Sequence, residues 1–226
     1  MIHQFIFAGP KPGLSSEAFL SYWINFHAVE YAAKIPRIKQ YSIAGREPSH
    51  GERELPFYQG VAEIWLNDDV DQIASLQSRE FLEGARRDEP RWAAFWQTLV
   101  LDTDPTVLRE YSGPQPWPEF TKLYVLLKRR AGLDLGEFRE RLLGRTVAVP
   151  KLQRHLVALA RPALYGLGEP RFDAIEVLSF HDHEAAAALL ATDGCMQSLA
   201  SATEADPRYL FTFIGRETWI IRPNGK

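Results

Sequence analysis

Apolar and polar positions follow each other along the chain in a way that predicts the same order of elements twice. In the first half, QFIFAGPKPGLSSEAF contains an apolar strand, a Gly-Leu turn and the start of a helix that includes Phe19. In the second half, KLYVLLKRRAGLDLGEF shows the same order up to Phe138. Superposing these two phenylalanines also places Gly13 on Gly132. The pattern therefore predicts two related halves.

Each half continues with further strands, a second helix and a last apolar segment. FYQGVAEIWLNDD and RFDAIEVLSFHDH predict strands that lead into a helix, and this alignment places Glu63 on Glu176. Ala- and Leu-rich segments with helical spacing follow, and both halves then carry a Pro-Arg-aromatic step, at residues 90–92 and 207–209. The predicted order in each half is β-α-β-β-α-β, which is the ferredoxin-like order.

A ferredoxin-like unit packs both helices on one face of its antiparallel sheet and leaves the other face uncovered. Two copies can cover these faces by packing sheet to sheet, so we expect an α+β fold in which two repeats form one intrachain α/β barrel. The alternatives are two independent units or a coincidental similarity of the halves. We expect a first repeat at residues 1–109, a Pro-rich linker at 110–118 and a second repeat at 119–226.

The overall composition limits the classes of partner. The 226 residues contain 26 Lys and Arg against 29 Asp and Glu, and this formal net charge of −3 offers no basic surface for nucleic acid. No apolar stretch approaches the roughly 18–20 residues that span a bilayer, and the first residues predict a strand rather than a signal peptide. The single cysteine, Cys195, cannot form an internal disulfide, so we expect a cytoplasmic protein.

The first predicted helix carries the clearest candidate for chemistry. Phe19, Trp23, Phe26, His27 and Glu30 recur at spacings of three and four, which predicts one shared helical face. One interpretation of His27 is a core histidine whose ring nitrogens are satisfied by the backbone and by Glu30. The other is an acid/base group, because imidazole titrates near neutral pH. Spacing alone does not separate the two.

The order of these motifs resembles an EthD-type domain. The resemblance is carried by the Gly-Leu-Ser-Ser turn, Phe19, the Tyr22-Trp23 pair, His27, Tyr41, the segment from Tyr58 to Trp65, and the acidic pair Asp88-Glu89 ahead of Phe95. It covers residues 1–109 and, more weakly, 119–223. No single element is specific, and the resemblance rests on their order and spacing.

The resemblance implies the dimeric α/β-barrel superfamily, with a barrel normally built from two chains and here from two halves of one. The Trp-x-x-x-His motif falls on Trp23 and His27, which makes His27 the expected acid/base residue. We expect Glu30 or Glu63 as the catalytic carboxylate that orients it. The corresponding helix of the second half has no histidine, so one site is expected. The expected aromatic lining for the substrate is Tyr22, Trp23, Phe5, Phe7, Tyr41, Tyr58 and Trp65.

The resemblance also implies a class of reaction. Relatives act on polyketide or aromatic intermediates, which favours a cofactor-independent lyase or cyclase performing elimination, decarboxylation or aldol cyclisation on a hydrophobic aromatic or polyketide-like small molecule. Three alternatives stay open: a cofactor-free monooxygenase of phenolic or anthrone substrates, a barrel that binds haem through His27, and a non-enzymatic barrel that binds an apolar metabolite. A monomeric pseudo-dimer or a homodimer is expected.

Two weaker patterns have simpler explanations. His181-Asp182-His183 has the spacing of metal ligands on a strand, but it lies where a strand meets a helix. We therefore interpret Asp182 as an N-cap and expect no metal site. Cys195 lies in a predicted helix beside Met196 and Leu199, which is typical of a packed apolar residue rather than a nucleophile.

Overall fold

Within the described residues, which are 1–50, 57–145, 148–192 and 194–223, the computed structural model contains eight strands. They are hydrogen-bonded in the order β1-β3-β2-β8-β5-β7-β6-β4, which closes into a barrel, so the expected α+β barrel is confirmed. The chain divides into two compact units. Unit 1 comprises Met1–Arg46, Pro56–Asp102 and Glu217–Lys226, and unit 2 comprises Glu47–Leu55 and Thr103–Arg216.

The elements of the first repeat follow the predicted order. The strands are β1 (Ile2–Ala8), β2 (Gln40–Arg46), β3 (Gly60–Leu66) and β4 (Leu99–Arg109), and the α-helices are α1 (Ser16–Tyr22), α2 (Ala28–Glu30), α3 (Asp69–Leu76) and α4 (Arg86–Asp88). Two π-helical turns, Trp23–His27 and Glu80–Ala85, interrupt the α-helices, and 3-10 turns cover Ala32–Lys34, Glu89–Arg91 and Phe95–Gln97.

The second repeat has the same order with one insertion. Its strands are β5 (Thr121–Leu127), β6 (Arg154–Ala160), β7 (Ala174–Phe180) and β8 (Phe211–Ile221), and its helices are α5 (Leu135–Gly144), α6 (Pro162–Leu167), α7 (His183–Leu190), α8 (Cys195–Thr203) and the 3-10 turn Pro207–Tyr209. The short helix α6, between the two middle strands, was not predicted from the sequence.

The N-cap predicted at Asp182 is confirmed, and two further helices begin with the same kind of cap. Ser15, Asp134 and Asp182 are N-caps whose side chains accept hydrogen bonds from backbone N–H groups in the first turn of α1, α5 and α7. Gly13 and Gly132 turn the chain before α1 and α5 with φ angles of 89° and 86°, a left-handed conformation that favours glycine. The repeat is therefore built from the same turn and cap chemistry in both halves.

The pairing register corrects one part of the predicted alignment. In unit 1 Ile6 pairs with Ala62, and in unit 2 Val125 pairs with Glu176. When the first strands are superposed as predicted, Glu176 therefore corresponds to Ala62. A shift of one residue along a strand moves a side chain to the other face of the sheet. The predicted equivalence of Glu63 and Glu176 is wrong.

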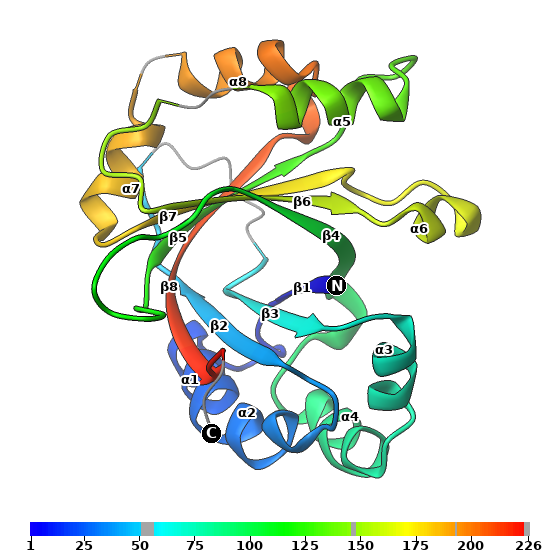
Figure 1. Ribbon diagram of the computed structural model, residues 1–226. Helices are drawn as coiled ribbons and strands as arrows, with labels where there is room; N and C mark the ends of the chain where they lie inside the picture. Colours follow the sequence, from blue (N-terminus) through cyan, green and yellow to red (C-terminus); the bar gives the residue numbers. More distant parts are fainter. Residues whose placement is uncertain (51–56, 146–147, 193, 224–226) are drawn as a thin grey trace. The chain divides into compact units, whose positions relative to one another are not determined.

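In unit 1 the helices α1 to α4, coloured from blue to green in Figure 1, lie on one side of strands β2 and β3. Aromatic side chains form much of the core between these layers. The rings of Phe19, Trp23 and Trp92 lie within 5.0 to 5.4 Å of one another, centroid to centroid, and all three side chains are buried. These three side chains belong to one hydrophobic core cluster between the sheet and the helices of unit 1.

In unit 2 the layer between the sheet and the helices is an apolar core. Apolar side chains of β5, β6 and β7 pack against those of α5, α7 and α8, and α5 lies beside α8 (Figure 1). A buried polar cluster completes this layer: His155 Nε2 lies 2.6 Å from Glu176 Oε1, and the Arg145 guanidinium pairs with the other oxygen. Glu176 thus has in unit 2 the position that Ala62 has in unit 1, and its carboxylate is paired with His155 and Arg145.

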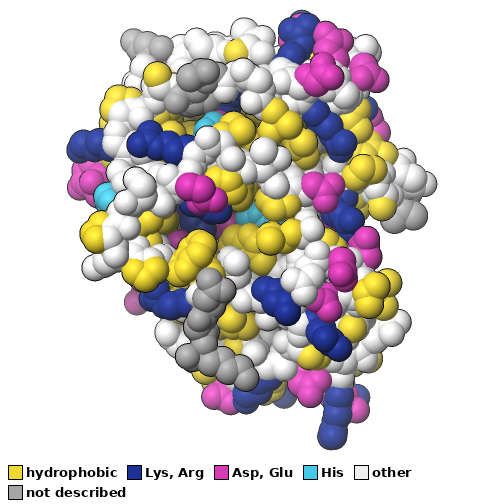
Figure 2. Space-filling model, viewed as in Figure 1, with side chains coloured by type: hydrophobic (Ala, Val, Ile, Leu, Met, Phe, Trp, Pro, Cys, Tyr) yellow, Lys and Arg dark blue, Asp and Glu magenta, His cyan; other side chains and the backbone are white. Residues whose placement is uncertain are grey.

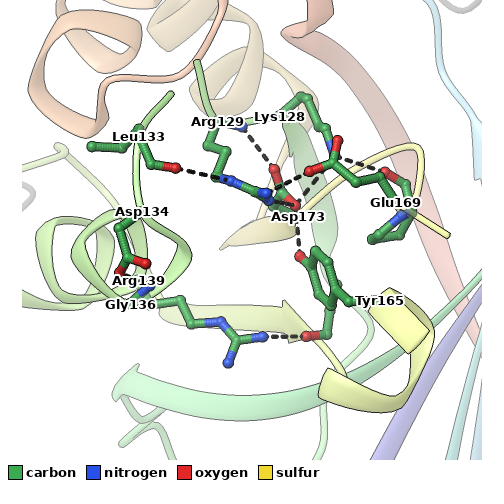
Figure 3. A network of polar contacts seen from close by, with 11 residues as sticks. Lys128, Arg129, Leu133, Asp134, Gly136, Arg139, Tyr165, Glu169 and Asp173 are labelled. Carbon is green, nitrogen blue, oxygen red and sulfur yellow. Dashed lines mark hydrogen bonds and ion pairs between the residues drawn. The ribbon is translucent and has the colours of Figure 1, made fainter. Parts of the chain in front are cut away.

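A second polar network in unit 2 anchors the segment between β6 and β7 (Figure 3). The fully buried Asp173 accepts hydrogen bonds from the Arg129 backbone N–H at 2.9 Å, the Arg129 guanidinium at 2.6 Å and the Tyr165 hydroxyl at 2.6 Å. Lys128 Nζ lies 3.3 Å from the same carboxylate, and Glu169 pairs with both cations. Because these charges neutralise one another, the network is structural.

Charges of both signs are mixed on the face of the molecule that Figure 2 shows. On the face seen in Figure 2, Lys and Arg side chains are interspersed with Asp and Glu and with apolar residues, in keeping with the small net charge. No helix in the described part of the chain has the length and apolar character needed to cross a membrane. The same residues contain no group of three or more His, Cys, Asp or Glu side chains that could hold a metal ion.

Candidate active site

Unit 1 encloses a cavity of about 420 Å³ between its sheet and its helices. This volume is in the range of small-molecule pockets. Alternate residues of β1, namely Gln4, Ile6 and Ala8, form its floor, because successive side chains of a strand point to opposite faces. The lining is mainly apolar, and its ionisable side chains are His27, Tyr41, Glu89 and Asp102.

The first helix changes its winding where it meets the cavity. Trp23–His27 form a π-helical turn, closed by a hydrogen bond from the Ala28 N–H to the Trp23 carbonyl oxygen. Such turns are rare in proteins overall, and many of those that occur lie at functional sites. The Trp23 ring packs directly on the backbone of Gly60, where an added Cβ would lie only 2.7 Å from Trp23 Cζ3. This close contact fixes the wall of the cavity beside His27.

The change of winding also corrects the predicted helical face. Phe19, Trp23 and His27 are buried, but Phe26 is 40% exposed and Glu30 lies at the surface. The expected stripe of five residues is therefore divided, with three facing the core and two facing solvent.

His27 is held by the carboxylate of Asp88, which lies at the end of α4, far from His27 in the sequence. Its Nδ1 atom lies 2.9 Å from Oδ2 of Asp88, which is 2% exposed. The other oxygen of Asp88 accepts hydrogen bonds from the Tyr22 hydroxyl at 2.9 Å and from Arg91 Nη1 at 3.4 Å. Asp88 is thus fixed by three donors, and its position determines the orientation of the imidazole.

The electrostatic surroundings favour a neutral His27. Burial lowers its pKa below the ordinary 6.5, and the hydrogen bond and charge of Asp88 oppose this shift only in part. An ionised carboxylate can only accept, so Nδ1 carries the proton and donates it to Asp88. Nε2 is then the nitrogen with a free lone pair, in a residue that lines the cavity. His27 is therefore equipped to act as a base.

A second titratable group lines the same cavity. Burial raises the pKa of Glu89 to about 7, against a lowering influence of Arg86, whose Nη1 lies 3.0 Å from Glu89 Oε2. At neutral pH a substantial fraction of Glu89 is protonated and can donate a hydrogen bond or a proton. The cavity thus holds a neutral imidazole and a partly protonated carboxyl group together.

Two polar atoms of the lining have no hydrogen-bond partner within the described part of the chain. They are Nε1 of Trp92, a residue that is 4% exposed, and Oγ1 of Thr98. The Trp92 ring lies 4.7 Å from the His27 ring, centroid to centroid. A buried donor without a partner costs about 1–3 kcal/mol, and such groups in native structures call for an explanation.

The structure brings together only part of the predicted aromatic lining. Trp23 and Tyr41 line the cavity with His27, while the hydroxyl of Tyr22 contacts Asp88. The other four predicted residues do not line it: Phe5, Phe7, Tyr58 and Trp65. Phe5, Phe7 and Trp65 alternate with lining residues along β1 and β3, so they point to the opposite face of the sheet.

Neither carboxylate that we expected to orient His27 occupies that position. The Glu30 carboxylate is at the surface and binds Lys34 Nζ at 3.0 Å, one turn along the helix. The Glu63 carboxylate lies 2.8 Å from Nε2 of His3, on the face of the sheet that points away from the cavity. Asp88 takes this position instead.

Sequence reasoning noted the acidic pair Asp88-Glu89 as part of the family resemblance but gave it no role. Tyr22, His27 and the acidic pair all belong to the elements that carry the resemblance, but 61 residues separate His27 from Asp88. Asp102 was missed altogether. It contacts Gln4 and Gln72, which lie 98 and 30 residues away in the sequence.

The sequence is similar to a known protein family. The family model described as the EthD domain matches residues 11–95, which contain His27, Asp88 and Glu89, so the resemblance found in the sequence is confirmed. No curated protein matches the sequence.

Solved structures match over nearly the whole chain at low identity. A candidate monooxygenase from Fusobacterium nucleatum subsp. nucleatum ATCC 25586 is 9% identical with a TM-score of 0.59, over 99% of this chain and 94% of that one. An anthrone oxidase-like protein is 11% identical with a TM-score of 0.59, over 97% and 92%. A candidate monooxygenase from Lactobacillus acidophilus NCFM is 10% identical with a TM-score of 0.53, over 97% and 93%. These likenesses show the shared fold.

Proposed function

We propose that this chain, whose residues 11–95 match the EthD domain, is a cofactor-independent enzyme of the lyase or cyclase class. Its substrate is a hydrophobic aromatic or polyketide-like small molecule, and His27 is the general base. The observation that carries this proposal is the hydrogen bond between His27 Nδ1 and the buried Asp88, which leaves Nε2 for an apolar cavity of about 420 Å³.

The chemistry follows from the two titratable groups. His27 Nε2 removes a proton from a carbon next to a carbonyl group, and the electron pair moves onto the carbonyl oxygen to form an enolate. In an elimination, the enolate re-forms the carbonyl and expels a β-hydroxyl group, which takes a proton from Glu89 and leaves as water. In an aldol cyclisation, the enolate carbon attacks a second carbonyl group, and the oxygen of that group takes a proton from Glu89. Atoms and charges balance in both cases.

The partnerless donor of Trp92 supports this assignment. An enolate oxygen needs a hydrogen-bond donor in a site from which water is excluded, and one donor of this kind contributes about 10²–10³ in rate. Trp92 Nε1 is buried without a partner in a residue that lies against the His27 ring. Because this nitrogen has almost no accessible surface, a substrate carbonyl reaches it only when the side chains around it shift, and its neighbouring carbon then lies beside the base.

Carbon-acid exchange tests the role of His27 without knowledge of the natural substrate. Anthrone and an acyclic 1,3-diketone are incubated with the protein in D₂O under argon, and exchange of the acidic C–H is followed by NMR. We expect His27→Gln to lower the rate by about 10²-fold or more at an unchanged melting temperature. His181→Gln, outside the cavity, is the matched control. Equal rates for wild type and His27→Gln would contradict the proposal.

A cofactor-free monooxygenase is the second candidate, and the same cavity favours it. A neutral base in an apolar pocket can deprotonate a phenol or an anthrone, and the resulting carbanion can react with dioxygen directly. One oxygen atom then enters the substrate as a carbonyl and the other leaves as water. The similar structures named as monooxygenases share only the fold with this chain. Oxygen uptake with anthrone in air, dependent on His27, would favour this candidate over the first.

Two other outcomes separate the remaining alternatives. A Soret band in the purified protein would indicate haem bound through His27. Tight binding of anthrone with no exchange and no oxygen uptake would indicate a non-enzymatic binding protein.

A further inference from the structure

The cavity of unit 1 has a second polar end, far from His27. Asp102 accepts a hydrogen bond from Gln4 Nε2 at 2.7 Å on one carboxylate oxygen and from Gln72 Nε2 at 3.0 Å on the other. All three side chains line the cavity, and they come from β4, β1 and α3. Each partner is a neutral amide, so the charge of Asp102 is held in place without being neutralised by these contacts.

The two polar ends are separated along the first strand. Gln4 lies near the start of β1, and Ala8, which also lines the cavity, ends the strand. Just beyond this end, the Lys11 N–H donates to the carbonyl oxygen of Trp92, the residue that packs against His27. Four residues of extended strand span about 13 Å. A molecule in contact with both ends is therefore elongated, and longer than a single aromatic ring.

The charges of the lining exclude one class of substrate. The described residues that line the cavity include no Lys and no Arg, and their carboxyl groups are those of Glu89 and Asp102. A carboxylate, a phosphate or a coenzyme A ester placed there would lose its hydration without gaining a cation from these residues. The cavity therefore selects against anionic groups.

The hydrogen-bonding capacity of the Asp102 end fits a hydroxyl group. An ionised carboxylate has about four lone-pair sites, and the two amides use two of them. Each amide also has a second N–H. A hydroxyl can donate to Asp102 and accept from Gln4 or Gln72 at the same time, whereas an ammonium group can only donate.

We propose that Asp102, held by Gln4 and Gln72, recognises a hydroxyl group at the far end of an uncharged, elongated polycyclic substrate whose reacting carbon lies at His27. This assignment rests on the proposed function, because it takes His27 as the reacting end. It adds that the natural substrate carries a phenolic or alcoholic hydroxyl at the end opposite to the site of proton removal, and that it reaches the enzyme as a free neutral molecule.

Calorimetric titration with three rigid tricyclic probes tests this recognition. The probes are 2-hydroxyanthraquinone, anthraquinone and anthraquinone-2-carboxylate. Because hydrogen bonds to charged groups are stronger than neutral ones, we expect the wild-type protein to bind the hydroxyl probe about tenfold or more tightly than anthraquinone. We expect the carboxylate probe to bind most weakly. Tighter binding of the carboxylate, or equal binding of the first two probes, would overturn the assignment.

Variants test whether the preference for the hydroxyl probe depends on Asp102. Asp102→Asn should remove most of the preference for the hydroxyl probe, and Gln72→Ala, on the outer helix α3, should reduce it severalfold if Asp102→Asn does not fold. Asp104→Asn is the matched control, because this exposed residue lies two positions further along β4 and pairs with Arg161. A preference that survives both Asp102→Asn and Gln72→Ala contradicts the proposal.

The binding test is independent of the chemistry at the other end. His27→Gln should keep the preference for the hydroxyl probe, because the groups proposed to recognise the hydroxyl are Asp102, Gln4 and Gln72. If the preference is present and carbon-acid exchange is absent, the function proposed for His27 fails and the recognition site stands. If exchange depends on His27 and the preference is absent, only the recognition site fails.

Discussion

The imidazole of His27 and the carboxylate of Asp88 form a buried pair in which Nδ1 and Oδ2 are 2.9 Å apart. Both side chains are almost fully buried, and the Tyr22 hydroxyl and Arg91 fix the second carboxylate oxygen. The pair joins the π-helical turn that follows α1 to the end of α4. It therefore couples the orientation of a candidate base to the packing of two segments that enclose the cavity.

We expect Asp88→Asn to lower kcat/KM by about 10²–10⁴-fold. An amide facing Nδ1 can donate its own N–H, and Nε2 then carries the imidazole proton and cannot act as a base. The measurement is carbon-acid exchange at the pH optimum, with the melting temperature recorded for each variant. Glu30→Gln, at the surface, is the control and should leave the rate unchanged. A fully active Asp88→Asn protein would show that Asp88 has no orienting role.

The pH dependence of the rate of elimination should be bell-shaped, with its centre below neutrality. His27 acts as a base when it is unprotonated, so the rate rises as the pH passes its pKa, which burial holds below 6.5. Glu89 acts as an acid when it is protonated, so the rate falls as the pH passes its pKa of about 7. Profiles of kcat/KM between pH 4.5 and 9 measure both limbs.

The variant Glu89→Gln tests whether the alkaline limb of the pH–rate profile belongs to Glu89. Glutamine cannot donate a proton to a leaving hydroxyl, so we expect a lower rate for elimination and the loss of the alkaline limb, with the acid limb retained. Glu83→Gln, an exposed partner of Arg79, is the matched control and should keep the whole profile. An alkaline limb that persists in Glu89→Gln would assign it to another group.

The sequence predicted the order of elements well because local signals specify them. Strand alternation, the caps Ser15, Asp134 and Asp182, and the turn glycines each act within a few residues. The π-helical turn at Trp23–His27 has no such signal, because its apolar spacing fits an α-helix equally well. Regular spacing therefore placed Glu30 on the buried face, where the structure has it exposed.

The candidate site was predictable only in part, for a physical reason. His27 and Trp23 lie on one helix, and their proximity follows from helical geometry. The partner of His27 depends on how separate segments pack, and strand register determines whether a glutamate faces the cavity or the opposite side. Glu63 lies on the face of β3 that points away from the cavity and is paired with His3, and the contact of Asp88 with His27 required the tertiary fold.

Gly60→Ala should destabilise the protein by about 1–3 kcal/mol, because a Cβ there would lie 2.7 Å from Trp23 Cζ3 and 3.2 Å from Leu20 Cδ2. Gly45→Ala is the matched control on the neighbouring strand, where the nearest atom, Leu20 Cδ1, lies at 3.4 Å. Urea denaturation compares the two free energies of unfolding. A Gly60→Ala protein as stable as Gly45→Ala would mean that Trp23 moves freely, against the fixed wall described above.

Trp92→Phe should separate stability from activity. The change removes the buried indole N–H that has no partner in the described part of the chain, and it keeps an aromatic ring against Phe19, Trp23 and His27. The smaller ring costs packing energy, but removal of an unsatisfied donor returns about 1–3 kcal/mol. We therefore expect a free energy of unfolding close to that of the wild type.

The rate should respond differently to the same change. If the indole N–H stabilises the enolate oxygen, Trp92→Phe loses that interaction only in the transition state, so kcat should fall by about 10²–10³-fold with a small change in KM. Trp96→Phe, at an exposed tryptophan, is the control for both measurements. A loss of stability of several kcal/mol together with an unchanged kcat would show that Trp92 serves the core and takes no part in the reaction.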